Sequence, residues 1–179
     1  LLVGQYQTLK KIVSPLHIAS MPFSIIIYPK LITYFETKQV KKFIKIIARA
    51  SLSLMLFSIL YIIIVYNLLH IILGLMNITV NESIYSLYIL ISIVALLIVQ
   101  LWWVRIFSNT VNPNYSIYMN LFATIYQLTI SLFVAKYLGL YVLLWSLIIM
   151  NIVMLLFWII KLQSYNRLTL NNIKYKGII

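Results

Sequence analysis

Positive side chains interrupt an apolar stretch at the start of the chain. Residues 3–31 include Lys10, Lys11 and His17, with prolines at positions 15, 22 and 29. A cation at membrane depth costs about 3 kcal/mol or more and usually faces protein or water. Proline inside a span is tolerated where neighbours or water satisfy the freed carbonyls. We therefore expect this stretch to line a wet cavity, in which Lys10 or Lys11 meets an anion.

Helical spacing gathers the polar side chains of this stretch on one side. One stripe holds Tyr6, Lys10, Ser14, His17 and Ser24. The neighbouring stripe holds Lys11, Pro15, Ile18 and Pro22. The alternative is that both lysines lie near the outer end of a span and extend to the lipid headgroups. That alternative fits Lys11 better, because Lys10 has the polar companions.

A second polar stripe lies late in the chain, within an apolar stretch. It consists of Asn120, Thr124, Gln127 and Ser131, which recur on one helical face. Small polar side chains in membrane helices commonly hydrogen-bond to neighbouring helices, at about 0.6 kcal/mol each. The other role for such a stripe is to line a hydrophilic cavity, and the sequence leaves both roles open.

The composition is that of a membrane protein. Of the 179 residues, 64% are hydrophobic and only 9% are charged, with a formal net charge of +12. The cations lie beside apolar stretches, so anionic headgroups and membrane topology explain them better than nucleic acid does. We expect no nucleic-acid partner. Cysteine is absent, which leaves no disulfide framework or thiol chemistry.

These stretches predict an all-α, polytopic membrane helix bundle with five transmembrane helices in a single domain, 1–179. The expected spans are about 3–29, 51–75, 84–107, 115–137 and 140–160. A basic amphipathic segment at 30–49 and a tail at 161–179 carry six and four cations, whereas the loop at 76–83 carries none. Cytoplasmic loops are enriched in Lys and Arg, so both basic segments should lie in the cytoplasm.

Several local features of these spans carry further expectations. Ser51, Ser58 and Tyr61 share one face of the second span. Trp102, Trp103 and Arg105 end the third span and predict an interfacial anchor of aromatic and basic side chains. A tight turn is expected at 136–139, between the last two spans.

The residues for enzyme chemistry are largely missing. The chain has two Glu, two His and no Asp, and these four side chains are scattered over different levels. A catalytic metal needs several such ligands, and nucleotide hydrolysis usually needs a Gly-rich phosphate loop, which is absent here. We expect a protein that is not an enzyme and uses no cofactor or metal.

The first span resembles one helix of the bacterial polysaccharide (O-antigen) flippases. The matching residues are Gly4, Tyr6, Lys10 or Lys11, Pro15 and the run Tyr28-Pro29-Lys30-Leu31. These flippases belong to the multidrug/oligosaccharidyl-lipid/polysaccharide exporter superfamily, which often has Arg at the basic position. The resemblance extends along the chain and implies that its five spans correspond to the last five of a twelve-helix flippase.

The resemblance also implies a function. It predicts part of a transporter that flips undecaprenyl-diphosphate-linked oligosaccharide across the bacterial inner membrane, together with an N-terminal transporter half that this chain lacks. Lys10 or Lys11 would then pair with the diphosphate, and His17 would add a second donor. The hydroxyls of the sugar would meet Asn120, Thr124, Gln127 and Ser131. The chain begins with Leu, which we interpret as the start of the C-terminal part of a longer protein or of a truncated product.

Other classes of function remain open. The chain could be a non-transporting membrane scaffold or assembly subunit, or a decayed gene fragment, with its polar stripes joining helices. An exporter of another substrate in the same superfamily is a third reading. Such exporters usually place an acidic residue within a span, and no Asp or Glu lies in any predicted span here.

Overall fold

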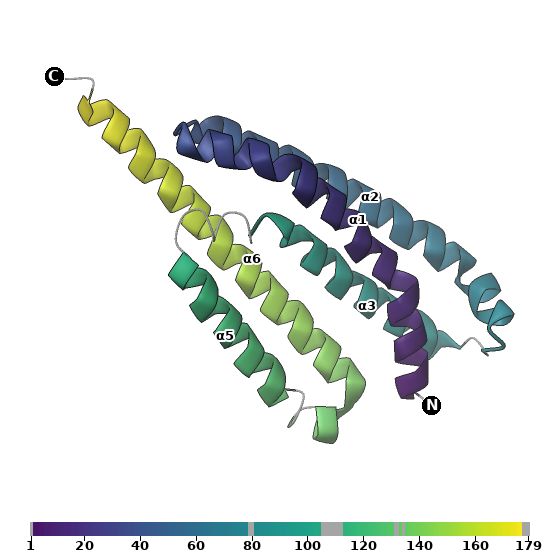
Figure 1. The fold of residues 1–179 in the computed structure, drawn as a ribbon. Coiled ribbons are helices and arrows are strands. Elements are labelled where there is room, and N and C mark those ends of the chain that lie inside the picture. Colours follow the sequence, from purple (N-terminus) through teal and green to yellow (C-terminus); the bar gives the residue numbers. More distant parts are fainter. Residues whose placement is uncertain (1, 79–80, 105–112, 131–132, 134, 177–179) are drawn as a thin grey trace.

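Long helices form all the regular structure of the described residues in this computed structural model (Figure 1). The structure describes residues 2–78, 81–104, 113–130, 133 and 135–176. Within these ranges it leaves out the side chains of 2–3, 19, 23–24, 113–116, 135–138 and 166–176. The helices are α1 (Leu2–Glu36), α2 (Val40–Leu75), α3 (Glu82–Gln100), α5 (Pro113–Thr129) and α6 (Ala135–Lys176).

Three helical segments of the described residues are long and apolar enough to cross a membrane. They are Val40–Leu75, Glu82–Val104 and Gly139–Tyr165. A bent pair, Gly4–Pro22 and Ile25–Glu36, makes a fourth if it counts as one span. The multi-pass helical class expected from the sequence is therefore confirmed, with three to four candidate spans rather than the five expected.

The predicted span that is missing from these candidates is 115–137. Its helix, α5, has 17 residues and ends at Thr129, whereas a span needs about 20 apolar residues. Residues 131, 132 and 134 of that predicted span lie outside the described part of the chain. The predicted third span also reaches residues 105–107, which are not described.

The helix α1 bends by 42° between its two halves, Gly4–Pro22 and Ile25–Glu36. It contains Pro15, Pro22 and Pro29, each of which removes a helical N–H and crowds the carbonyl four residues earlier. A bend in a helix is usually found at such residues. The prolines thus explain why α1 is bent while α2, of similar length and with no proline, is not among the broken pairs.

A turn of three residues, Thr37 to Gln39, joins α1 to α2 in a helical hairpin. Lys38 adopts a positive φ of 56° there, and the Gln39 N–H donates to the Tyr34 carbonyl at 2.8 Å. Helix α2 then runs unbroken from Val40. The residues of the basic amphipathic segment expected at 30–49 divide between the end of α1, the turn and the first turns of α2.

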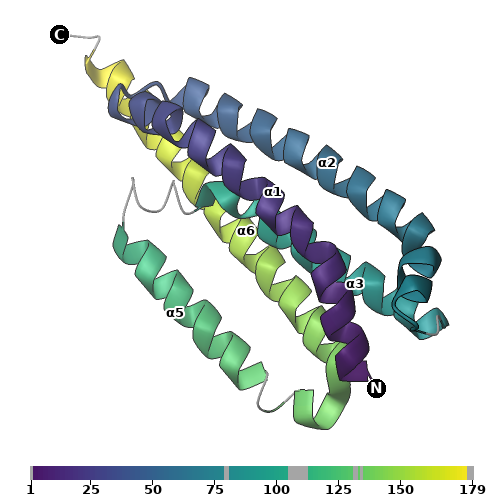
Figure 2. The ribbon, with the colours of Figure 1, turned by 45° about the vertical axis from the view of Figure 1, so that its right-hand side comes forward.

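The core lies around α3, which packs against α1, α2 and α6 (Figures 1 and 2). The side chain of Asn81 caps α3 by accepting a 3.0 Å hydrogen bond from the Ile84 N–H. Leu87 and Tyr88 of α3 are fully buried. A helix buried on several sides suits the near absence of charge along 82–104.

Helix α6 contains the turn that was expected at 136–139. Gly139 has φ 82° and ψ 179°, which interrupts the helical geometry. Beyond it the helix continues to Lys176. Residues 161–176, expected as a tail, are thus helical, and the fifth predicted span, 140–160, forms the first part of the helix that follows Gly139.

Candidate functional site

The polar stripe of α1 lies beside the stripe that this helix buries. Leu9, Val13 and Leu16 are at most 2% exposed, and they form the packing face. Lys10, Ser14 and His17 are all exposed. At about 100° per residue, each exposed residue here lies roughly a quarter-turn round the helix from its buried neighbour. The first half of α1 therefore offers a cationic, hydroxyl-bearing and imidazole-bearing face next to the core.

The two lysines of α1 point in different directions. Lys11 lies about 200° round the helix from Leu9, on the side opposite the buried stripe. Its stripe contains Ile18, which is 61% exposed. Lys10 instead shares its stripe with Ser14 and His17. The register of the core thus places Lys10 beside the packed face of α1 and Lys11 on the opposite side.

Two hydrogen bonds hold α1 at the level of these lysines. Pro15 has no N–H to offer the Lys11 carbonyl, and the Ser14 hydroxyl donates to that carbonyl at 2.8 Å. One residue further on, the Ile12 carbonyl accepts a 2.7 Å hydrogen bond from the Tyr61 hydroxyl of α2. The backbone that carries Lys10 is therefore anchored both within α1 and across to α2.

The polar stripe of α5 has the same relation to its packing face. Asn120, Thr124 and Gln127 are exposed, and they flank a more enclosed stripe that includes Tyr126. The Tyr126 hydroxyl donates to the Ser146 carbonyl of α6 at 3.3 Å. Thr124 donates to the carbonyl of Asn120 at 2.8 Å, within its own helix. Ser131, the last predicted member of this stripe, lies outside the described residues.

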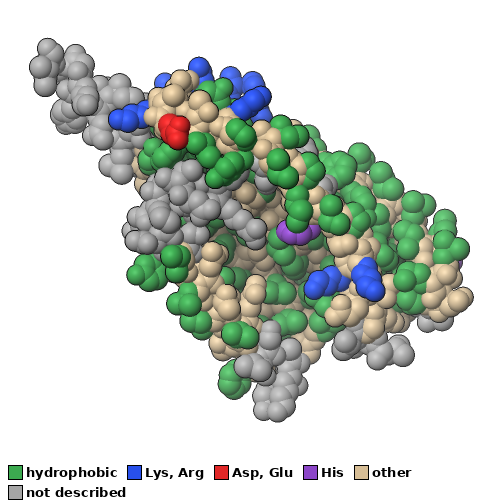
Figure 3. Space-filling view, in the orientation of Figure 1, with side chains coloured by type: hydrophobic (Ala, Val, Ile, Leu, Met, Phe, Trp, Pro, Cys, Tyr) green, Lys and Arg blue, Asp and Glu red, His purple; other side chains and the backbone are tan. Residues whose placement is uncertain are grey.

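The structure does not bring the two predicted polar stripes together into one closed site. In both ribbon views α6 runs between α5 and α1 (Figures 1 and 2). Figure 3 shows two groups of Lys and Arg on one face, of which the lower pair lies near a histidine. Each stripe is thus an open surface on its own helix, so any site that uses both needs further protein or a substrate spanning the distance.

A buried polar row between α1, α2 and α3 was only partly foreseen. The shared face of Ser51, Ser58 and Tyr61 is confirmed, since Ser58 is fully buried and Tyr61 reaches α1. Tyr88 of α3 was missed: it is fully buried, and its hydroxyl donates to the Ile62 carbonyl at 3.0 Å. A tyrosine among β-branched and leucine residues gives no sign in the sequence of which carbonyl it will reach.

The two tryptophans at the end of α3 are packing residues. Trp102 and Trp103 are 6% and 4% exposed, and the Trp102 Nε1 donates to the Ser51 hydroxyl at 3.2 Å. Residues of α2 and α6 lie beside Trp103, and the interfacial anchor expected from these tryptophans stays a prediction. Arg105, its third expected member, lies outside the described residues.

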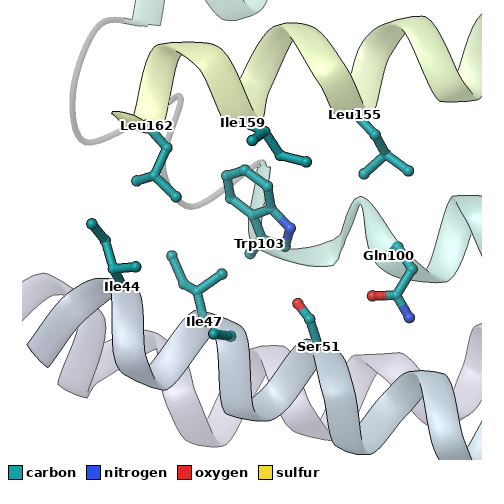
Figure 4. A pocket seen from close by; sticks show the side chains of 9 residues that line it. Ile44, Ile47, Ser51, Gln100, Trp103, Leu155, Ile159 and Leu162 are labelled. Atoms are coloured by element: carbon teal, nitrogen blue, oxygen red, sulfur yellow. The ribbon is translucent and has the colours of Figure 1, made fainter. Parts of the chain in front are cut away.

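An apolar groove lies between α2, α3 and α6 at this same end (Figure 4). Its volume is about 400 Å³, within the range of about 300–1,000 Å³ typical of ligand sites. The lining includes Ala48 and Ser51 of α2, Gln100 of α3 with the following Trp103, and Ile159 of α6. The Gln100 Nε2 is buried and has no hydrogen-bond partner among the described residues. No pattern in the sequence predicts this groove.

Comparisons with protein-family models, curated proteins and solved structures gave no match for this chain. Among the described residues there is no group of three or more His, Cys, Asp and Glu side chains that could hold a metal ion.

Proposed function

We propose that this chain is part of a membrane transporter that moves lipid-linked oligosaccharide, carried on undecaprenyl diphosphate, across the bacterial inner membrane for surface polysaccharide synthesis. In this proposal its helices correspond to the last five of a twelve-helix flippase. The observation that carries the proposal is the exposed face of Lys10, Ser14 and His17 on a proline-bent apolar helix. A helix that only anchors a protein in lipid does not need such a face, whereas a helix that binds an anionic substrate does.

Each part of the substrate has a matching surface in this proposal. The ammonium group of Lys10 is a compact point charge for the diphosphate. His17, about two helical turns away on the same stripe, supplies a further hydrogen-bond donor. The amide and hydroxyl groups of Asn120, Thr124 and Gln127 suit sugar hydroxyls. Because α6 separates these surfaces, a glycan of several sugars would extend from one to the other, within a cavity completed by the partner half of the transporter.

Separate substitution of the two lysines tests the proposal. The complete transporter that contains this chain would carry Lys10→Gln or, as the matched control, Lys11→Gln. Losing a charged hydrogen bond should lower transport roughly tenfold to a hundredfold for the first variant, and Lys10→Arg should retain most of it. Surface polysaccharide, measured at equal protein level, is the readout. Unchanged export in Lys10→Gln would remove the proposed anion contact.

A membrane scaffold is the second candidate, favoured by one observation. The hydroxyl of Thr124 is already satisfied by the Asn120 carbonyl of the same helix, so this part of the stripe needs no substrate. Under the scaffold reading, combined substitution of Lys10 and His17 leaves export unchanged but reduces co-purification of a membrane partner. The same strains therefore separate the two candidates.

A further inference from the structure

We propose that the groove between α2, α3 and α6 holds one acyl chain of an anionic phospholipid from the cytoplasmic leaflet, whose phosphate lies against Lys41 and Lys45. This site differs from the exposed face of α1, and it does not depend on the transport activity. The proposal rests on two observations: the apolar lining of the groove and the cations beside it.

The lining fits a hydrocarbon chain. Apart from Ser51 and Gln100, the groove is lined by aliphatic side chains and Trp103 (Figure 4). The groove is partly open to its surroundings. It lies within candidate spans, since Val40–Leu75 and Gly139–Tyr165 supply two of its walls. In a bilayer the surrounding solvent at this depth is acyl chain, so a partly open apolar groove is filled by lipid.

The cations beside the groove select the headgroup. Lys41 and Lys45 are exposed and lie one turn apart on the stripe that continues to Ala48, a residue of the groove lining. Both precede Ala48 in α2, so they lie on the side of the turn between α1 and α2. That end of the molecule carries six Lys and Arg in residues 30–49 against one carboxylate, Glu36. Such an excess attracts anionic lipid at the cytoplasmic surface.

The groove runs away from the lysines into the bundle. Ile44 lines the groove next to Lys45, whereas Ser51 and Gln100 lie farther along it (Figure 4). Ser51 lies six residues beyond Lys45, which is about 9 Å along α2. A phospholipid with its phosphate at the lysines therefore places the first part of one acyl chain along the groove.

Tryptophan quenching in vesicles tests this site. The purified full chain is reconstituted into phosphatidylcholine vesicles that contain increasing fractions of phosphatidylglycerol or phosphatidylcholine with dibrominated acyl chains, which quench nearby indoles. We expect stronger quenching by the brominated phosphatidylglycerol, and loss of that difference in Trp103→Phe. Equal quenching by the two brominated lipids overturns the proposal, as does a difference that survives in Trp103→Phe.

Charge variants locate the headgroup. Lys41→Gln with Lys45→Gln should reduce the preference for phosphatidylglycerol by roughly fivefold per lysine. The matched control is Lys38→Gln with Lys42→Gln, which removes the same charge from the same end. Lys42 faces α1, with its Nζ 5.9 Å from the centre of the Tyr34 ring, so the preference should remain. An equal loss in both pairs means a general surface-charge effect and overturns the site.

Two further variants test the contribution of the groove independently of the lysines. Ala48→Phe should fill the groove and abolish the preference while the helix content by circular dichroism is kept. Gln100→Leu should keep the preference and leave the unfolding temperature in lipid-free detergent unchanged or higher, because it removes an unpaired donor from an apolar groove. A preference that persists in Ala48→Phe overturns the proposal, since the lysines would then act without an acyl-chain site.

Discussion

The hydroxyl of Tyr61 on α2 donates a 2.7 Å hydrogen bond to the main-chain carbonyl of Ile12 on α1. This contact joins two helices next to Pro15, where the helical hydrogen bonding of α1 is already incomplete. It also lies two residues from Lys10, so it helps to fix the backbone that presents the exposed polar face.

Tyr61→Phe should therefore destabilise the protein by about 0.6 kcal/mol, with an upper bound near 1.7 kcal/mol, as for other hydrogen bonds between membrane helices. The measurement is unfolding in mixed detergent micelles followed by circular dichroism. Tyr66→Phe is the matched control, because it removes a hydroxyl from the same helix at a side chain that is 41% exposed. Equal effects of the two substitutions would contradict a specific role for the Tyr61 hydroxyl.

Ser14 should matter only while Pro15 is present. Its hydroxyl donates to the Lys11 carbonyl, which lacks its usual helical donor because residue 15 is proline. We expect Ser14→Ala to cost about 1 kcal/mol in the native background and close to nothing in Pro15→Ala, where the N–H is restored. A double-mutant cycle of unfolding free energies measures this coupling. Additive effects of the two substitutions would show that the hydroxyl does not compensate for the proline.

Two glycines should respond to alanine in opposite ways. Gly139, at φ 82° and ψ 179°, occupies a region that is nearly restricted to glycine, so Gly139→Ala should destabilise by about 1–3 kcal/mol. Gly74 lies within α2, and Gly74→Ala should stabilise by about 0.8–1 kcal/mol through helix propensity. A Cβ at either position meets no atom within 4 Å, so packing does not confuse the comparison. Unfolding free energies of the same sign for both variants would contradict the backbone assigned to Gly139.

The hydrogen bond between Trp102 and Ser51 should couple α3 to α2. Because the Nε1 donates to the serine hydroxyl at 3.2 Å, Trp102→Phe and Ser51→Ala should each destabilise, and the double variant should cost less than their sum. We expect a coupling of about 0.6 kcal/mol from a double-mutant cycle. Tryptophan emission, compared between the native chain and Ser51→Ala, reports the same contact independently.

The sequence predicts which stretches are helical and apolar better than it predicts their ends. Apolar composition identified α2, α3 and the middle of α6, because a span needs a long run of such residues. The charge change near position 50 suggested a boundary in α2, but helical hydrogen bonding continues from Val40 through it. Charged side chains on an exposed helical surface impose no break in the backbone.

Helical periodicity predicts which residues of the candidate site share a face of α1, but it does not predict how the other helices pack around that face. The stripe of Lys10, Ser14 and His17 follows from helical periodicity, and all three side chains are exposed. Sequence alone could not separate Lys10 from Lys11, since that choice depends on which side of α1 meets α3. The burial of Trp102 and Trp103 and the groove beside them also depend on neighbouring helices, which leave no periodic pattern in the chain.

The short turn from Thr37 to Gln39 holds α1 and α2 together as a hairpin. Their six nearby cations would be held back on the side where synthesis occurs, because Lys and Arg bias sets the orientation of inserted helices. This hairpin would then dictate the direction in which α3 and α6 enter the bilayer. Reversing the charges at this turn should consequently invert the membrane orientation of helices that contain none of the altered residues.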